Sequence, residues 1–183
     1  MYIHKTMTDL KFNVAQLLRE EVGGRREYEF DERALPLDDE ITLRQIVGHV
    51  RFARTASGVL ANVEARGVAE MPCMRCLNPS TQAIDVQFRD EFHSKIEVNT
   101  GFPLPKPEEE DPFFITENHM VDLGEAIREY ALLALPMQPL CRPGCLGICP
   151  ICGADRNVEP CGCQADEPDD RFAALKALLE KDE

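Results

Sequence analysis

Six cysteines fall within 23 residues, in the stretch 141-CRPGCLGICPICGADRNVEPCGC-163, and the chain has only eight in all. The other two lie close together in 73-CMRCLNP-79. Spacings of this kind form disulfide frameworks outside the cell and metal or catalytic sites inside it. The possible roles of the thiols, and therefore the folds open to the chain, depend first on the compartment.

The amino-terminal stretch MYIHKTMTDLKFNVAQLLREEVGG has no charged segment followed by an uninterrupted apolar core, so it does not resemble a secretory signal. No window approaches the roughly 18 consecutive apolar residues that a membrane-spanning helix needs. We therefore expect a cytoplasmic protein. In that compartment stable disulfides are disfavoured, and metal binding becomes the leading interpretation of the cysteines.

The cysteines form four close pairs, and a pair in a tight turn can aim two thiolates at one metal ion. The strongest element is 149-CPICG-153, where proline stiffens the turn and glycine lets backbone amides point at sulfur. Its nearest partner, 161-CGC-163, begins nine residues after Cys152. Zinc prefers a tetrahedron of four such ligands, so we predict a zinc site formed by Cys149, Cys152, Cys161 and Cys163.

Two pairs remain, Cys73 with Cys76 and Cys141 with Cys145. If a helix before Cys141 lies across the sheet, its end brings the second pair to the first and makes another four-cysteine site. Alternatively, Cys141 and Cys145 complete the carboxy-terminal site. All eight cysteines are thus candidate ligands for one or two structural zinc ions, with iron as the alternative metal. Arginines lie among them, and their charge would offset that of the thiolates: Arg75, Arg142 and Arg156.

The sequence gives little support for catalysis. Cys145, Cys149 and Cys152 match the C-x3-C-x2-C spacing of radical enzymes, but those enzymes need a large α/β barrel that this pattern does not predict. No strand–helix–strand pattern surrounds any C-x-x-C pair, as a thioredoxin-like fold requires. The histidines are scattered, and no glycine-rich phosphate loop is present. We expect no catalytic residues, no organic cofactor and no enzyme; a zinc- or thiol-dependent oxidoreductase is the alternative.

The chain before the cysteine cluster predicts an α+β domain built on an antiparallel sheet that could close into a barrel. Strands are expected over 26–31, 41–54, 59–66 and 84–89, with a turn at 55–58. In 59-VLANVEAR-66, residues of opposite polarity alternate, which is typical of a half-buried strand. Asn13 with Gln16 predicts a short capped helix that ends before Gly23.

A second helix is expected over 121–136, beginning near Asp122 and ending at Pro136. It presents one apolar face, formed by Leu123, Ile127, Tyr130, Ala131 and Ala134, and should pack across the sheet. The sequence thus divides into a sheet-and-helix domain over 1–136 with a mobile acidic, proline-rich loop at 103–112, a zinc-binding cluster over 137–165, and an amphipathic helix over 166–183.

The formal net charge is −13, and most of the excess acid lies after residue 100. Thiolates holding zinc would add about two negative charges per site. A surface of this sign repels phosphate backbones, so it favours a basic protein as partner over direct contact with RNA. Direct RNA binding would need five arginines to gather on one face of the sheet: Arg25, Arg26, Arg44, Arg51 and Arg54.

The order of motifs resembles that of the YceD family, the large ribosomal RNA subunit accumulation proteins. The resemblance is carried by FNVAQLL, 73-CMRCLNP-79, 122-DLGEAIREYALLALPMQPLC-141, 149-CPICGADRN-157, the CGC pair and DDRFAALKALL. It implies a bacterial ribosome-biogenesis factor that promotes accumulation of 23S ribosomal RNA. The partner it implies is a ribosomal protein, for which L32 is a candidate, or an rRNA-maturation factor.

Overall fold

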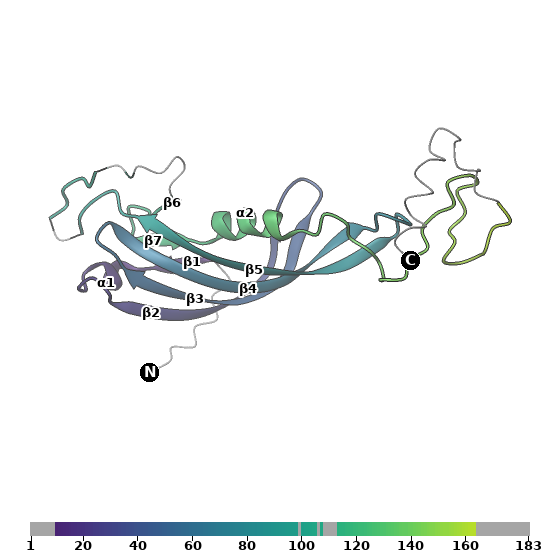
Figure 1. Cartoon of the computed structure of the whole chain (residues 1–183). Coiled ribbons are helices and arrows are strands. Elements are labelled where there is room, and N and C mark those ends of the chain that lie inside the picture. Colours follow the sequence, from purple (N-terminus) through teal and green to yellow (C-terminus); the bar gives the residue numbers. More distant parts are fainter. Residues whose placement is uncertain (1–9, 99, 106, 108–112, 164–183) are drawn as a thin grey trace, which may run out of the picture.

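The computed structural model of the chain describes residues 10–98, 100–105, 107 and 113–163. It confirms the α+β class, an antiparallel sheet with a packed helix (Figure 1). In chain order the elements are β1 (Lys11–Asn13), α1 (Ala15–Leu18), β2 (Arg25–Pro36), β3 (Thr42–Arg54), β4 (Gly58–Pro72), β5 (Pro79–His93), β6 (Phe113–Phe114), β7 (Met120–Asp122) and α2 (Gly124–Ala134).

The main sheet has five strands in the order β2-β3-β4-β5-β6. The four long strands form consecutive antiparallel hairpins, as the short connections predict. The sheet is open, with β2 and β6 at its two edges, so it does not close into the barrel that the sequence left as an option. The short strand β6, which the sequence did not predict, pairs with β5 in parallel because the long connection after β5 returns the chain in the same direction.

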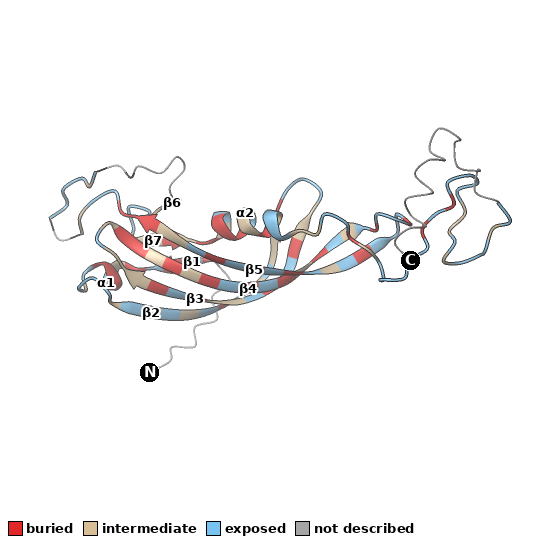
Figure 2. Ribbon diagram, in the orientation of Figure 1, coloured by how far each residue is buried: buried red, intermediate tan, exposed pale blue. Residues whose placement is uncertain are grey.

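Alternating polarity explains which face of the sheet is covered. On β4 the side chains of Val59, Ala61 and Val63 are buried, and so are those of Ile84 and Val86 on β5. The residues between them are half-buried or exposed, which gives the banded pattern of Figure 2. The periodicity of two thus sets both the strand assignment and the face that packs on the core.

Helix α2 packs on the sheet mainly through β5. The ring of Tyr130 stacks on Phe88 with centroids 4.5 Å apart, and its hydroxyl donates to Asp90 Oδ2 at 3.1 Å. The predicted apolar face is correct for Ile127 and Ala131, but Ala134 is exposed and does not belong to it. The reason is that the helix ends at Ala134, where the chain turns away toward the cysteines.

Strands β1 and β7 pair as a small antiparallel sheet that covers part of the core. From β1, Phe12 packs against three aromatic rings of the main sheet, those of Tyr28, Phe30 and Phe52. The helix predicted after Asn13 is present but is only four residues long. The predicted cap of Asn13 with Gln16 is wrong, because the N-cap is Val14, which makes no side-chain capping hydrogen bond. Asn13 Oδ1 instead accepts a hydrogen bond from the backbone N–H of Ala15, two residues along the chain.

The strands of the sheet differ in length at the far end of β4 and β5. Strand β3 pairs with β4 only as far as Leu43 opposite Ala69, whereas β4 and β5 stay paired to Pro72 opposite Pro79. The β4–β5 hairpin therefore projects beyond the rest of the sheet. Its tip carries the first cysteine pair, and the segment that follows α2 lies beside that tip (Figure 1).

Two parts of the expected organisation lie wholly or partly outside the described residues. They are the helix over 166–183 and most of the acidic part of the loop over 103–112. Within the described part of the chain, no helix combines the length and apolar character needed to cross a bilayer.

The turn between β3 and β4, predicted at 55–58, is fixed by two charged side chains. Arg54 donates from Nε to the carbonyl of Leu18 at 3.1 Å and from Nη1 to that of Gly58 at 2.9 Å. The Glu91 carboxylate accepts hydrogen bonds from the hydroxyls of Thr55, at 2.6 Å, and Ser57. Partial burial by itself raises the pKa of Glu91, but these hydroxyls outweigh it and hold the pKa below its ordinary value.

We predict that Glu91→Gln lowers stability by about 1 kcal/mol at pH 7, because it removes the charge from two hydrogen bonds. A depressed carboxyl pKa contributes stability above the unfolded-state value of about 4.3 and loses it as pH falls through the folded-state value. The difference between variant and parent in the free energy of unfolding, measured with urea, should therefore shrink below about pH 4. A difference in the free energy of unfolding that stays constant from pH 7 to pH 3 would contradict this account. The control is Glu70→Gln, at an exposed site on β4.

Candidate metal centre

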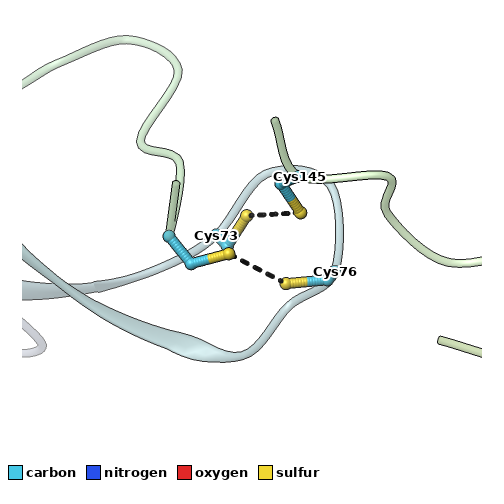
Figure 3. Close-up of side chains that lie close together, drawn as sticks. Cys73, Cys76 and Cys145 are labelled. Atoms are coloured by element: carbon cyan, nitrogen blue, oxygen red, sulfur yellow. Dashed lines mark hydrogen bonds between the residues drawn. The ribbon is translucent and has the colours of Figure 1, made fainter. Parts of the chain in front are cut away.

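The tip of the β4–β5 hairpin and the segment after α2 bring four thiols together: those of Cys73, Cys76, Cys141 and Cys145. The sulfurs of Cys73 and Cys145 are 3.8 Å apart, and those of Cys76 and Cys141 are 3.7 Å apart. All four lie within 4.8 Å of one another, and three of the four residues are buried. Figure 3 shows the thiols of Cys73, Cys76 and Cys145 pointing toward a common centre. We call this group the first cluster.

Local backbone geometry builds the first half of this cluster. The carbonyl of Cys73 accepts from the N–H of Leu77 at 2.9 Å, and the N–H of Cys73 donates to the carbonyl of Asn78 at 2.9 Å. Leu77 closes the turn in the left-handed region, with a φ of 63°. This tight turn places Cys73 and Cys76 on the same side of the hairpin tip.

Contacts from the tip hold the second half in place. The N–H of Met74 donates to the carbonyl of Pro139 at 2.9 Å, and Gln82 Nε2 donates to that of Leu140 at 3.1 Å. These bonds fix the chain directly before Cys141. The helix end thus delivers the second cysteine pair to the first, which is the arrangement we predicted if α2 lay across the sheet.

The distances between sulfurs fit a metal ion. Four sulfurs at about 2.3 Å from a central zinc stand about 3.8 Å apart in a regular tetrahedron. The two measured distances, 3.8 Å and 3.7 Å, agree with this value. A disulfide needs sulfurs at about 2.05 Å, and all eight cysteines have free thiols. The donor set and its spacing therefore suit a tetrahedral metal bound by four thiolates.

Without metal, the four thiols of the first cluster differ in how readily they lose a proton. The backbone amide of Cys141, with those of Cys76 and Arg75, holds the pKa of Cys73 at about 6. Burial and the neighbouring sulfurs raise the pKa of Cys141 to about 12. Amides directed at sulfur are the usual means of stabilising a thiolate, whereas four negative sulfurs cannot coexist without a cation. The site therefore needs positive charge to become fully ionised.

The second cluster consists of Cys149, Cys152, Cys161 and Cys163, whose sulfurs also lie within 4.8 Å of one another. Cys149 is buried, Cys161 is half-buried, and the other two are exposed. The turn is closed by the N–H of Gly153, which donates to the carbonyl of Cys149 at 2.9 Å, with Gly153 at a φ of 75°. Backbone amides of Cys152 and Ile151 hold the pKa of Cys149 at about 6.

The structure thus groups the eight cysteines into the same two sets of four that the sequence suggests for two sites. The alternative, in which Cys141 and Cys145 complete the carboxy-terminal site, does not apply. Of the three arginines expected near the thiols, Arg75 donates from Nη1 to the carbonyl of Cys145 at 2.8 Å. Arg142 donates to Asn157 Oδ1 at 2.8 Å, and for Arg156 the backbone N–H bonds to the carbonyl of Gly147 at 2.9 Å.

Sequence reasoning missed three polar residues that surround the first cluster. Asn157 Nδ2 donates to Cys145 Sγ at 3.4 Å, and Asp155 accepts hydrogen bonds from Asn157 and, at 3.1 Å, from Asn78 Nδ2. Asn78 and Asn157 stand inside the quoted motifs CMRCLNP and CPICGADRN, directly beside the cysteine turns. Their position after a turn was the available signal, but only the fold shows that they meet.

Comparison with known proteins supplies the family. A family model described as "Large ribosomal RNA subunit accumulation protein YceD" matches residues 61–179, which is more than half of the chain. The chain belongs to the YceD family. The matched segment contains most of β4, all of β5 and α2, and every cysteine of both clusters.

Individual relatives agree with this assignment. An uncharacterised protein of Mycobacterium tuberculosis is 29% identical over 130 residues, 71% of this chain and 60% of that protein. One from Mycobacterium leprae is 32% identical over 127 residues, 68% of this chain and 54% of its own length. A chloroplastic protein of Arabidopsis thaliana, "Large ribosomal RNA subunit accumulation protein YCED homolog 1", is 31% identical over 68 residues, 37% of this chain and 21% of that protein. The chain thus spans a little over half of the mycobacterial relatives, and no solved structure matches it.

Gly147 offers a direct test of the joint between the two halves of the first cluster. It has a φ of 72°, and a Cβ at this position would lie 2.8 Å from the carbonyl oxygen of Arg75. Because both the conformation and the space exclude a side chain, Gly147→Ala should weaken binding of added Zn²⁺ at least tenfold in competition with a chelator, if the thiols hold a metal. Gly144→Ala is the matched control, since a Cβ there meets nothing within 4 Å. Equal zinc affinity in the two variants would show that this close approach is not needed.

Proposed function

We propose that this protein promotes the accumulation of large-subunit ribosomal RNA by binding a component of the large subunit, and that each cysteine cluster holds one structural zinc ion. Membership of the YceD family supports the biological role, because the family's description names that function. The observation that carries the molecular part is the pair of clusters, each with four thiols within 4.8 Å of one another.

The closed donor sets favour structural over catalytic metal. A catalytic zinc keeps one position open for water, whereas four thiolates fill the tetrahedron. No histidine, aspartate or glutamate of the described chain belongs to either cluster. Bound zinc would cross-link the hairpin tip to the segment after α2. Such sites contribute on the order of 10–16 kcal/mol toward the folded form of small zinc domains.

The surface around the clusters supports a binding role. Met74, Leu77, Leu146 and Ile151 are between 54% and 64% exposed, and all lie within or directly beside the cysteine turns. Large apolar side chains gathered at one end of a molecule, with arginines among them, are typical of protein interfaces. We therefore propose that this end docks onto a protein partner.

Charge distribution favours a basic protein over naked RNA. Three of the five arginines that direct RNA binding would require are engaged in contacts within the chain. Arg26 pairs with Glu20, Arg51 with Glu27 at 2.6 Å, and Arg54 holds the turn through backbone carbonyls. With a net charge of −13, the chain suits a positively charged ribosomal protein or a maturation factor.

We predict two zinc ions per chain in native mass spectrometry of protein purified without chelator, with elemental analysis of the same sample identifying the metal. One ion would confine metal to a single cluster, which Cys73→Ser and Cys149→Ser would then identify. Absence of metal, with free or disulfide-bonded thiols, would reject structural zinc and favour the oxidoreductase alternative. Rapid alkylation of Cys73 or Cys149 in metal-loaded protein, together with disulfide turnover, would support that alternative.

The binding role predicts that Met74→Ser with Leu77→Ser lowers the ratio of 23S to 16S ribosomal RNA in cells that lack their own copy of the gene. The variant should keep its metal content, because neither side chain is a ligand. Val22→Ser, at a site 69% exposed on the far end of the sheet, is the control. A normal ratio in the double variant would reject this surface. A steep salt dependence of binding to naked ribosomal RNA would instead support direct RNA contact.

A further inference from the structure

We propose that the two clusters bind metal cooperatively, and that Asp155 and Asn157 are the positioning residues that couple them. This inference rests on the proposed zinc binding and adds a relation between the two sites. Its basis is a network of hydrogen bonds in which residues placed by the second cluster complete the surroundings of the first.

The connection between the clusters is short. Cys145 belongs to the first and Cys149 to the second, and only Leu146, Gly147 and Ile148 separate them. This tripeptide is tied on both sides. The N–H of Ile148 donates to the carbonyl of Arg75 in the first cluster's turn at 2.9 Å, and the carbonyl of Gly147 accepts from the N–H of Arg156 at 2.9 Å.

Asp155 connects the second cluster's turn to the hairpin tip. It follows Ala154, whose carbonyl accepts from the N–H of Cys149 at 2.8 Å, and it forms an isolated bridge with Ile148. Its Oδ2 accepts from Asn78 Nδ2 on the hairpin at 3.1 Å. Its Oδ1 accepts from both the N–H and the Nδ2 of Asn157, at 2.9 and 2.7 Å. The carboxylate therefore fixes the orientation of the Asn157 amide.

Asn157 acts directly on the first cluster. Its Nδ2 donates to Cys145 Sγ at 3.4 Å, and its Oδ1 accepts from the N–H of Leu146 and from Arg142 Nη2, both at 2.8 Å. One side chain thus holds the backbone and the neighbouring guanidinium on either side of Cys145 while directing a donor at its sulfur. A hydrogen bond to a ligand sulfur orients the ligand and stabilises its thiolate form.

The second cluster's loop has little else to hold it. Among residues 150–163 none is buried, so no apolar core orders this segment. Metal bound to its four thiols would supply the order and would place Asp155 and Asn157 before the first cluster binds. The conformational entropy of the loop is then lost once, when the first ion binds, and not again when the second ion binds. By linkage, metal in the first cluster must raise the affinity of the second by the same factor.

We expect a coupling factor between about 5 and 100, in the usual range for coupled sites. It is measured by titrating the full chain with Co²⁺, whose tetrahedral thiolate complexes absorb visible light. Two variants each keep one cluster: Cys76→Ser with Cys141→Ser keeps the second, and Cys152→Ser with Cys163→Ser keeps the first. The coupling factor is the overall constant for binding two ions to the parent, divided by the product of the constants of these two variants. In an Asn157→Ala background the same ratio should fall toward 1. Glu159→Gln, on the same loop, is the matched control and should leave it unchanged.

The outcomes separate the two proposals. A ratio of 1 in the parent, with two ions bound, would overturn the coupling and leave structural metal binding intact. A ratio above 5 that Asn157→Ala does not change would overturn the role of Asn157. Failure of the parent chain to bind Co²⁺ or Zn²⁺ at all would overturn the proposed zinc sites, and the coupling with them.

Discussion

The pairing of β4 with β5 beyond the end of β3 is the feature on which the rest of the structure depends. Up to Ala69 these strands belong to a sheet whose covered face is packed by aliphatic and aromatic side chains. Beyond it they form a two-stranded arm, and a hairpin of two strands is marginally stable by itself in water. The first cluster lies at the end of this arm, where packing by a third strand is absent and another source of stability is needed.

With metal bound as proposed, the thiols would supply that stability, because they come from both sides of the joint. Two belong to the hairpin tip and two to the segment after α2, and α2 is itself anchored on β5 through the stacked rings of Phe88 and Tyr130. A metal held by the four thiols would therefore close the route from the sheet through α2 to Cys141 and back to Cys73 into a loop. Because such a site is not preformed in the unfolded chain, the free energy of metal binding would add to the free energy of folding.

The sequence was most informative where one local pattern determines the structure. Alternation over 59–66 and 84–89 identified strands and their buried faces, and cysteine pairs in tight turns identified the thiol groups. It failed where the outcome depends on contacts distant in the chain. The parallel pairing of Phe113 with Phe92 follows from how a long loop returns. The meeting of Asn78 with Asp155 spans 77 positions, so no short window could reveal it.

The two clusters differ in their surroundings although their donor sets are the same. In the first, three of four cysteines are buried against the hairpin and Leu140. In the second, Cys149 alone is buried, and the loop depends on its own turns. Sulfur shielded from water exchanges ligands and meets oxidants less readily than exposed sulfur. With metal bound as proposed, the first cluster would therefore persist as part of the fold, whereas the second would be the one whose metal content can respond to the surroundings. Because Asn157 bonds to Cys145, such a response would also reach the end of the sheet.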